Sequence, residues 1–129
     1  MTRPAPTLGD IEVLAAHALK EIPVPFKQEL GSVLIRVEEL PDQETEAEMG
    51  LASPFDLLGL YRGAPLPHHS VSDPRAAIDM IFLYRRPILD CWCDTGEDLY
   101  AIVRHVLIHE IGHHFGFSDD DMERIERSR

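Results

Sequence analysis

The stretch that decides the fold is LYAIVRHVLIHEIGHHFG, residues 99–116. Its apolar residues cover most of the circumference of a helix, which is typical of a helix surrounded by protein. Thr95 is expected to cap this helix, with Asp98 three residues later completing a box-like pattern. Gly116 stands where a helix commonly ends in a left-handed residue. The sequence therefore predicts a long, buried helix that turns sharply at its C-terminal end.

The last turns of this predicted helix carry the motif His-Glu-x-x-His, at His109, Glu110 and His113. Two histidines four residues apart lie on the same side of a helix, so their imidazoles can bind one Zn²⁺ together. Glu110 falls on the neighbouring side, where its carboxylate can act as a general base without binding the ion. The alternative is an ordinary buried helix with two hydrogen-bonded histidines, and the residues around the motif favour the metal site.

A third metal ligand is expected just beyond the glycine. Asp119 lies ten residues after His109, and a turn at Gly116 would bring it back towards the two imidazoles. Asp120, or no third protein ligand, remains an alternative, because Ser118 and the acids after it are also typical of the start of a short last helix. Three protein ligands would leave one coordination position open, as a hydrolytic zinc site requires.

Other histidines are predicted to have supporting or structural roles. His114 points away from the motif pair, because neighbours in a helix diverge by about 100°. His105 lies one turn before His109 and is expected to line the site. His68 and His69 could bind metal, although adjacent histidines in a proline-flanked loop are more often solvated.

Length and charge exclude several classes of protein. The 129 residues predict one domain, 1–129, able to bury a core without disulfides. Cys91 and Cys93 are predicted to be reduced residues in a connection, since a bridge across one residue is strained. The formal net charge of -11 argues against nucleic acid or an anionic membrane as a partner. Without a signal-like or membrane-spanning stretch, the expected location is cytoplasmic.

The rest of the chain outlines an α+β fold. Residues 1–7 are expected to form a flexible arm, and 8–22 an amphipathic helix that stops at a proline. Residues 32–40 alternate as a strand does. The segment 41–50, rich in glutamate and poor in residues that can be buried, predicts a solvated loop. Residues 56–61 predict an apolar turn or a short strand.

A second informative run, Met80 to Tyr84, reads as a strand that Arg85, Arg86 and Pro87 interrupt. Proline and charge suit an edge strand, and an edge strand beside a zinc site could pair with an extended peptide. An ordinary sheet strand is an equally good interpretation. Candidate donors to a tetrahedral oxyanion are Tyr84 and Tyr100.

Three stretches together resemble the small bacterial zincin-like metallopeptidases, or mini-zincins, of the Asp type of zincin. They are LYRGAPL at 60–66, IFLYRRPI at 81–88 and HEIGHHFG at 109–116. The resemblance implies a compact, minimal α+β domain in which a small mixed sheet packs with an N-terminal helix, a buried active-site helix and a short C-terminal helix.

The same resemblance implies a function. It implies Zn²⁺ on His109, His113 and Asp119, Glu110 as the general base, and peptides or proteins as substrates. A methionine beneath the metal, as in larger relatives, would have to come from elsewhere in this chain, and Met80 is the candidate. The alternative is a non-catalytic zinc-binding domain that interacts with another protein. Glu110 argues against that alternative, since a structural site needs no such acid and more often closes with a fourth ligand.

Overall fold

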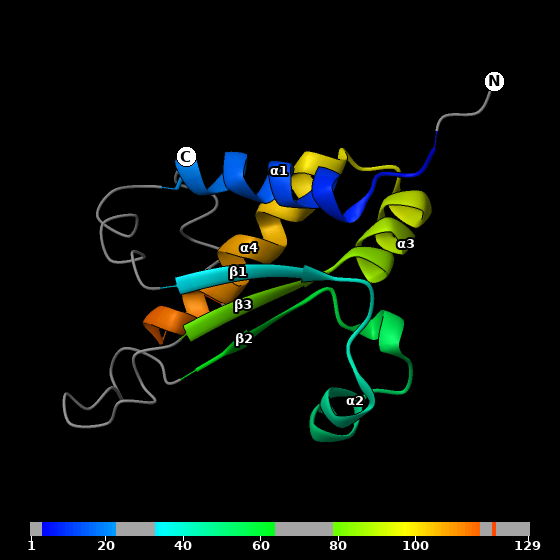
Figure 1. The fold of residues 1–129 in the computed structure, drawn as a ribbon, viewed down its shortest axis with the longest axis vertical. Coiled ribbons are helices and arrows are strands. Elements are labelled where there is room, and N and C mark those ends of the chain that lie inside the picture. The colour runs from blue at the N-terminus through cyan, green and yellow to red at the C-terminus, as the bar shows by residue number, and fades with distance from the viewer. Residues whose placement is uncertain (1–3, 23–32, 64–78, 117–119, 121–129) are drawn as a thin grey trace.

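A three-stranded mixed sheet with helices on both faces organises the chain (Figure 1). The computed structural model describes residues 4–22, 33–63, 79–116 and 120. In chain order the regular elements are α1 Leu8–Lys20, β1 Val33–Glu38, α2 Gln43–Met49, a 3-10 turn Pro54–Asp56, β2 Gly59–Arg62, β3 Asp79–Tyr84, α3 Arg85–Thr95 and α4 Leu99–Phe115. The expected α+β class is confirmed.

The strand β3 lies in the centre of the sheet, between β1 and β2. It pairs in parallel with β1, where Ile35 is opposite Ile81, and antiparallel with β2, where Tyr61 is opposite the same residue. The edge-strand interpretation of residues 80–84 is therefore wrong, and the ordinary sheet strand is right. Arg85 and Pro87 do not mark an edge, because they lie in the first turn of α3. Proline is tolerated there, since the N–H groups of the first turn have no hydrogen-bond partner within the helix and proline lacks one.

The core lies between the sheet and the pair α1 and α4. Ile11 from α1, Ile81 and Leu83 from β3, and Val103 and Leu107 from α4 are all fully buried. The predicted burial of the long helix is confirmed, and Gly116 ends it in the left-handed conformation, with φ 79°. This packing fixes one side of α4 against the strands.

The N-terminal cap of α4 differs from the expectation. Asp98 is the cap, and its carboxylate accepts a hydrogen bond from the backbone N–H of Ala101 at 3.1 Å. Thr95 instead ends α3, where its hydroxyl donates to the carbonyl of Cys91. Aspartate and threonine are both good caps, and Gly96, with φ 72°, ends α3 before α4 can begin.

The two faces of the sheet have different surroundings, because side chains alternate along a strand. Ile81 and Leu83 face the core, whereas Phe82 and Tyr84 face α2. Met80 alternates with Ile81 and therefore lies on the face away from α4. It does not lie beneath the predicted metal site, and that suggestion is wrong.

The segment 41–50 is a helix rather than the expected solvated loop. Asp42 caps α2 by accepting a hydrogen bond from the N–H of Thr45 at 2.8 Å, and Gly50 ends it with φ 63°. Thr45 is the buried residue of α2, and its hydroxyl accepts a hydrogen bond from Arg62 of β2. Arg62 also pairs with Glu48 at 3.2 Å, so two caps and two contacts with the sheet order a segment that buries almost nothing.

The remaining elements complete the frame. The predicted N-terminal helix is confirmed as α1, which starts with a capping box between Thr7 and Asp10. Just before it, the carbonyl of Pro6 accepts a hydrogen bond from Arg85 at 2.6 Å. Cys91 and Cys93 are free thiols, as expected, but they lie in α3 and not in a connection. Among the residues that the structure describes, every helix is too short or too polar to span a bilayer.

Candidate metal centre

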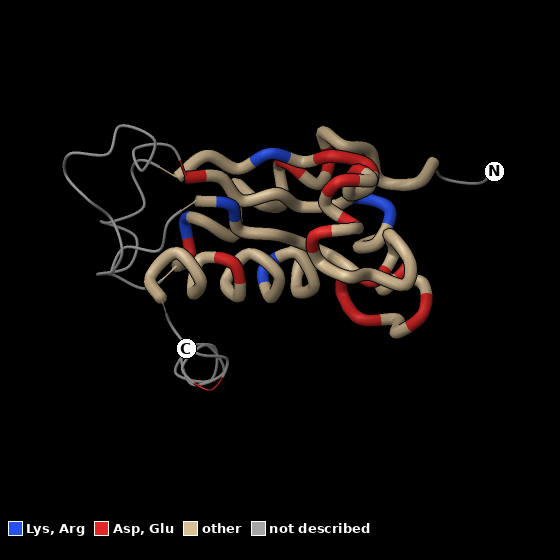
Figure 2. The backbone as a smooth tube through the Cα atoms, turned by 90° about the horizontal axis from the view of Figure 1, so that it is seen from below, with Lys and Arg blue, Asp and Glu red and all other residues tan. Residues whose placement is uncertain are grey.

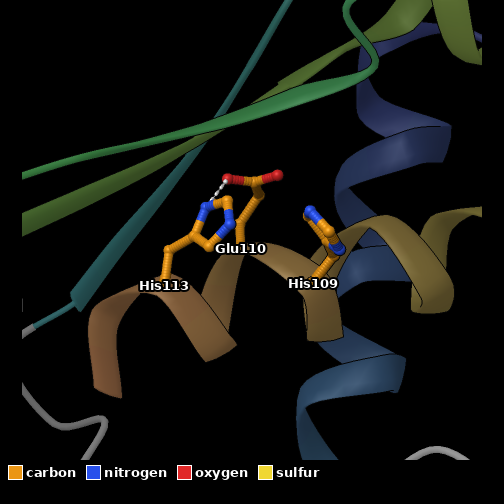
Figure 3. A group of neighbouring side chains, drawn as sticks. All are labelled: His109, Glu110 and His113. Atoms are coloured by element: carbon orange, nitrogen blue, oxygen red, sulfur yellow. Dashed lines mark hydrogen bonds and ion pairs between the residues drawn. The ribbon is translucent and has the colours of Figure 1, made fainter. Parts of the chain in front are cut away.

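The side chains of His109, Glu110 and His113 gather at the C-terminal end of α4 (Figure 3). One potential ligand atom from each residue lies within 4.8 Å of the others. Helical geometry explains the pair of histidines, since residues four apart lie one above the other. Their ring centroids are 4.8 Å apart. Two imidazoles and a carboxylate form a donor set that suits zinc, so the residues present fit such an ion.

Glu110 is held on the side of the cluster nearest the sheet. It is only 6% exposed, and its Oε1 accepts a hydrogen bond from the backbone N–H of Tyr61 at 2.8 Å. The same oxygen lies 3.1 Å from Nδ1 of His113. In Figure 3 the carboxylate points towards the strands, and a dashed line joins it to His113. Strand β2 therefore orients this acid through a main-chain donor.

A buried polar network continues behind Glu110. The hydroxyl of Tyr61 donates to Oδ1 of Asp79 at 2.9 Å and lies 3.3 Å from Nδ1 of His114. Asp79 and His114 are 1% and 0% exposed. Burial, followed by the hydrogen bond with Asp79, raises the pKa of the Tyr61 phenol well above its usual range, which keeps it neutral at physiological pH. The prediction that His114 is packed and not part of the motif pair is confirmed.

Two glycines beside this network, Gly59 and Gly63, lie so close to neighbouring atoms that a Cβ would not fit. A Cβ on Gly59 would lie 2.5 Å from Val106 of α4 and 3.4 Å from Glu110. A Cβ on Gly63, where φ is 145°, would lie 1.9 Å from the carboxylate of Asp79. Glycine therefore lets β2 approach α4 closely enough for its main chain to reach Glu110.

The other candidate residues separate into those near the cluster and those away from it. His105 stacks on His109 with ring centroids 6.5 Å apart, in agreement with a lining role. Tyr84 faces the opposite side of the sheet. Tyr100 lies on α4, ten residues before Glu110, and its hydroxyl donates a hydrogen bond to Glu21. With a rise of about 1.5 Å per residue, Tyr100 lies roughly 15 Å from Glu110 along the axis. Neither tyrosine is an oxyanion donor in this arrangement.

Asp119, the predicted third ligand, lies outside the described residues. Ser118 and Asp121 lie outside them as well. The histidine pair His68 and His69 also lies outside them. The short C-terminal helix expected after Gly116 falls largely in the same part of the chain.

Sequence reasoning missed the role of Tyr61. Its signal was present, because Tyr61 belongs to the stretch 60–66 that carries the resemblance, and Asp79 is a charge at the start of an apolar run. Neither observation reveals that the two side chains meet, since they are 18 residues apart in the chain.

Comparison with known protein families identifies the chain. The model of one family, the zincin-like metallopeptidases, matches residues 30–129. The chain belongs to this family. The zincin-like metallopeptidase match covers most of the chain, and the cluster at His109, Glu110 and His113 falls inside it. Among curated proteins, no sequence matches the chain significantly.

Proposed function

We propose that this zincin-like metallopeptidase is a zinc endopeptidase of the Asp type, with His109, His113 and Asp119 as metal ligands and Glu110 as general base. The convergence of His109, Glu110 and His113, whose potential ligand atoms lie within 4.8 Å of one another, carries the proposal. Asp119 is included because its spacing after Gly116 matches the resemblance. A zinc ion bound there would supply a Lewis acid that polarises a peptide carbonyl and acidifies water to a pKa of about 7.

The surroundings of Glu110 favour a base over a metal ligand. Its Oε1 is already engaged by the N–H of Tyr61 and lies beside His113. If Nδ1 of His113 carries its proton and donates to Glu110, the other ring nitrogen keeps a lone pair for a metal. Glu110 would then take a proton from the attacking water and return it to the leaving amine.

Strand β2 is the part of the sheet that we propose pairs with the substrate. It is an edge strand in the described sheet, and its Tyr61 reaches the cluster directly. An extended peptide could add alongside β2 through main-chain hydrogen bonds, which bring a scissile carbonyl close without demanding one sequence. The edge-strand interpretation, one of the two for residues 80–84, gave this role to that segment instead.

Metal content tests the ligand set. Zinc bound per purified chain is measured for the wild type and for His109→Ala, His113→Ala and Asp119→Ala. We expect about one zinc in the wild type and loss on removal of either histidine, because a two-ligand remainder holds zinc weakly. Normal zinc content in His109→Ala would contradict the proposed centre, and normal content in Asp119→Ala would remove that residue from it.

Cleavage tests the base. Glu110→Gln keeps the size of the side chain and a carbonyl acceptor for Tyr61, so it should bind zinc normally and cleave a peptide library at least ~100-fold more slowly. Glu12→Gln, at an exposed position of α1, is the matched control and should behave as the wild type. Unchanged cleavage by Glu110→Gln would overturn the role of Glu110. Four protein ligands around a bound zinc would favour the non-catalytic alternative.

A further inference from the structure

A cavity of about 170 Å³ lies on the face of the sheet opposite α4, between α2 and the strands. Its acidic lining comes from Glu38 at the end of β1, Asp42 at the cap of α2, and Glu44 and Glu48 on α2. Arg62 of β2 is the basic residue of its lining. Four carboxylates and one guanidinium give the lining a formal charge of -3, so the cavity attracts cations.

Part of this charge is already compensated within the protein. Arg62 pairs with Glu48 at 3.2 Å and donates to Thr45 at 2.9 Å. Glu38 pairs with Arg36 outside the cavity at 2.9 Å. Asp42 and Glu44 form no ion pair among the described residues. The carboxylate of Glu44 and the second oxygen of Asp42, whose Oδ1 accepts the N–H of Thr45, are therefore available to a cationic ligand.

Tyr84 provides an independent sign of a ligand. The residue is 97% buried, since only 3% of its surface is exposed, and it lines the cavity. Its hydroxyl has no hydrogen-bond partner within the described part of the chain. It is not one of the fully buried polar atoms that lack a partner, so this oxygen is open to the cavity although the rest of the side chain is buried. The oxygen of Tyr84 can accept a hydrogen bond from a donor that enters the cavity.

The electrostatics place the phenol among the charged groups of the cavity. Burial, opposed by Arg62 and reinforced by Glu38 and Asp42, raises the pKa of Tyr84 to about 12. Tyr84 is thus a neutral hydroxyl at physiological pH. Its ring is stacked with that of Phe82, at an interplanar angle of 6° and a centroid distance of 6.3 Å. Carboxylates around an aromatic surface are the chemistry that recognises organic cations.

A metal ion fits this cavity less well than an organic cation does. Among the described residues, the side chains that bring three potential ligand atoms within 4.8 Å of one another are those of His109, Glu110 and His113. The carboxylates of the cavity do not converge in this way. An aromatic wall and a guanidinium are also poor surroundings for Ca²⁺ or Mg²⁺, which require several oxygen ligands at once.

We propose that this cavity binds the guanidinium or ammonium group of an arginine or lysine side chain presented by another protein. The carboxylates of Asp42 and Glu44 pair with the cation, the hydroxyl of Tyr84 accepts an N–H bond, and the aromatic wall contacts the alkyl stem. In Figure 2 most of the acidic positions (red) lie towards the end of the molecule where the N-terminus is drawn. Together with the net charge of -11, this steers a basic protein surface towards α2.

The test uses a blocked pentapeptide with one arginine among glycines, titrated into the isotope-labelled full chain while backbone amide shifts are followed by NMR. We expect shifts confined to α2, β2 and the end of β3, and none with the same peptide carrying neutral citrulline. Asp42→Asn combined with Glu44→Gln should weaken binding by about three- to fivefold for each lost charge. Asparagine still caps a helix, so α2 is retained.

Controls separate the cavity from general charge attraction. Glu46→Gln removes an acid of α2 that does not line the cavity, and it should bind the peptide as the wild type does. Tyr84→Phe keeps the ring and should weaken binding, with folding checked by circular dichroism. Glu110→Gln should leave binding unchanged, so the outcome is independent of any peptidase activity.

Four results would overturn the proposal. Equal binding of the citrulline peptide would show that charge is not recognised, and equal loss in Glu46→Gln would show only general attraction. Shifts of the same amides by calcium chloride at lower concentration than the peptide would assign the cavity to a metal ion. Tighter binding of free agmatine than of the peptide would assign it to a small molecule instead of a protein.

Discussion

Two helices on opposite faces of the sheet, α4 and α2, are stabilised in different ways. Nine of the seventeen residues of α4 are buried, and burying one large apolar side chain contributes about 1.5–3 kcal/mol. One of the seven residues of α2 is buried, so its order depends on the Asp42 cap, the Gly50 turn and the bond from Arg62 to Thr45. A cap contributes about 1 kcal/mol.

This difference bears on what each face can do. The cluster on α4 projects from a helix that cannot shift without disturbing the core, which suits ligands that must keep a fixed geometry. The cavity beside α2 has one wall that can move at low cost, which suits a side chain arriving from outside. The contributions of α4 and of α2 to the free energy of unfolding can be measured separately.

The largest effect is expected from the core side of α4. Leu107→Ala removes a fully buried side chain and should lower the free energy of unfolding by about 2–5 kcal/mol. Denaturant titration followed by circular dichroism measures this. A loss below about 1 kcal/mol would mean that α4 is not anchored by packing, and the contrast with α2 would fail.

A smaller effect is expected where β2 meets α4. Gly59→Ala places a Cβ 2.5 Å from Val106, and the overpacking should cost about 1–3 kcal/mol. It should also lower peptidase activity, because β2 must move away and carry the N–H of Tyr61 from Glu110. Gly9→Ala is the matched control, since its Cβ meets ordinary contact at 3.7 Å and alanine favours a helix. Full activity in Gly59→Ala would show that this close approach does not matter.

The cap of α2 should matter less, and only locally. Asp42→Ala should cost about 1 kcal/mol and speed the hydrogen exchange of the Thr45 amide, while the amides of α4 keep their protection. Exchange of both helices by NMR separates the two outcomes. Equal acceleration in α4 would show that the two helices unfold as one unit.

Acid should have the smallest effect, again on α2. Hydrogen bonds from Thr45, with a further contribution from Arg62, lower the pKa of Asp42 below its ordinary value of 3.8. A carboxyl with a lowered pKa in the folded state stabilises above its unfolded pKa, and this stability is lost as the pH falls through the lowered value. The protection of the Thr45 amide, which is its exchange rate compared with that of an unstructured peptide at the same pH, should therefore fall below about pH 4 in the wild type. Asp42→Asn should lose this dependence.

The difference between the helices also explains what could be predicted from the sequence. The burial of α4 and its end at Gly116 follow from its apolar residues and are confirmed. The helix at 43–49 was missed because caps such as Asp42 and Gly50 are individually weak signals in a segment without apolar periodicity. The central place of β3 could not be derived, because strand order depends on pairings between distant parts of the chain.

The contacts of the candidate metal centre also differ in whether they could be predicted from the sequence. His109, Glu110 and His113 lie within one and a half turns of a single helix, so local geometry alone predicts that they meet. The main-chain donor of Tyr61, 49 residues before Glu110, depends on the approach of β2 to α4. Spacing within one helix is readable from the sequence, whereas a contact between elements requires the fold.

The position of β3 has a consequence for how the chain folds. The strand in the middle of the sheet is the last of the three to be synthesised, so β1 and β2 emerge from the ribosome with no partner. Their pairing must wait until Tyr84 has been added, and the parallel pairing then closes a loop of roughly 40 residues, which slows folding. The exposed strands of this nascent intermediate are open to association with other chains, and chaperones that bind extended segments would have their longest opportunity there.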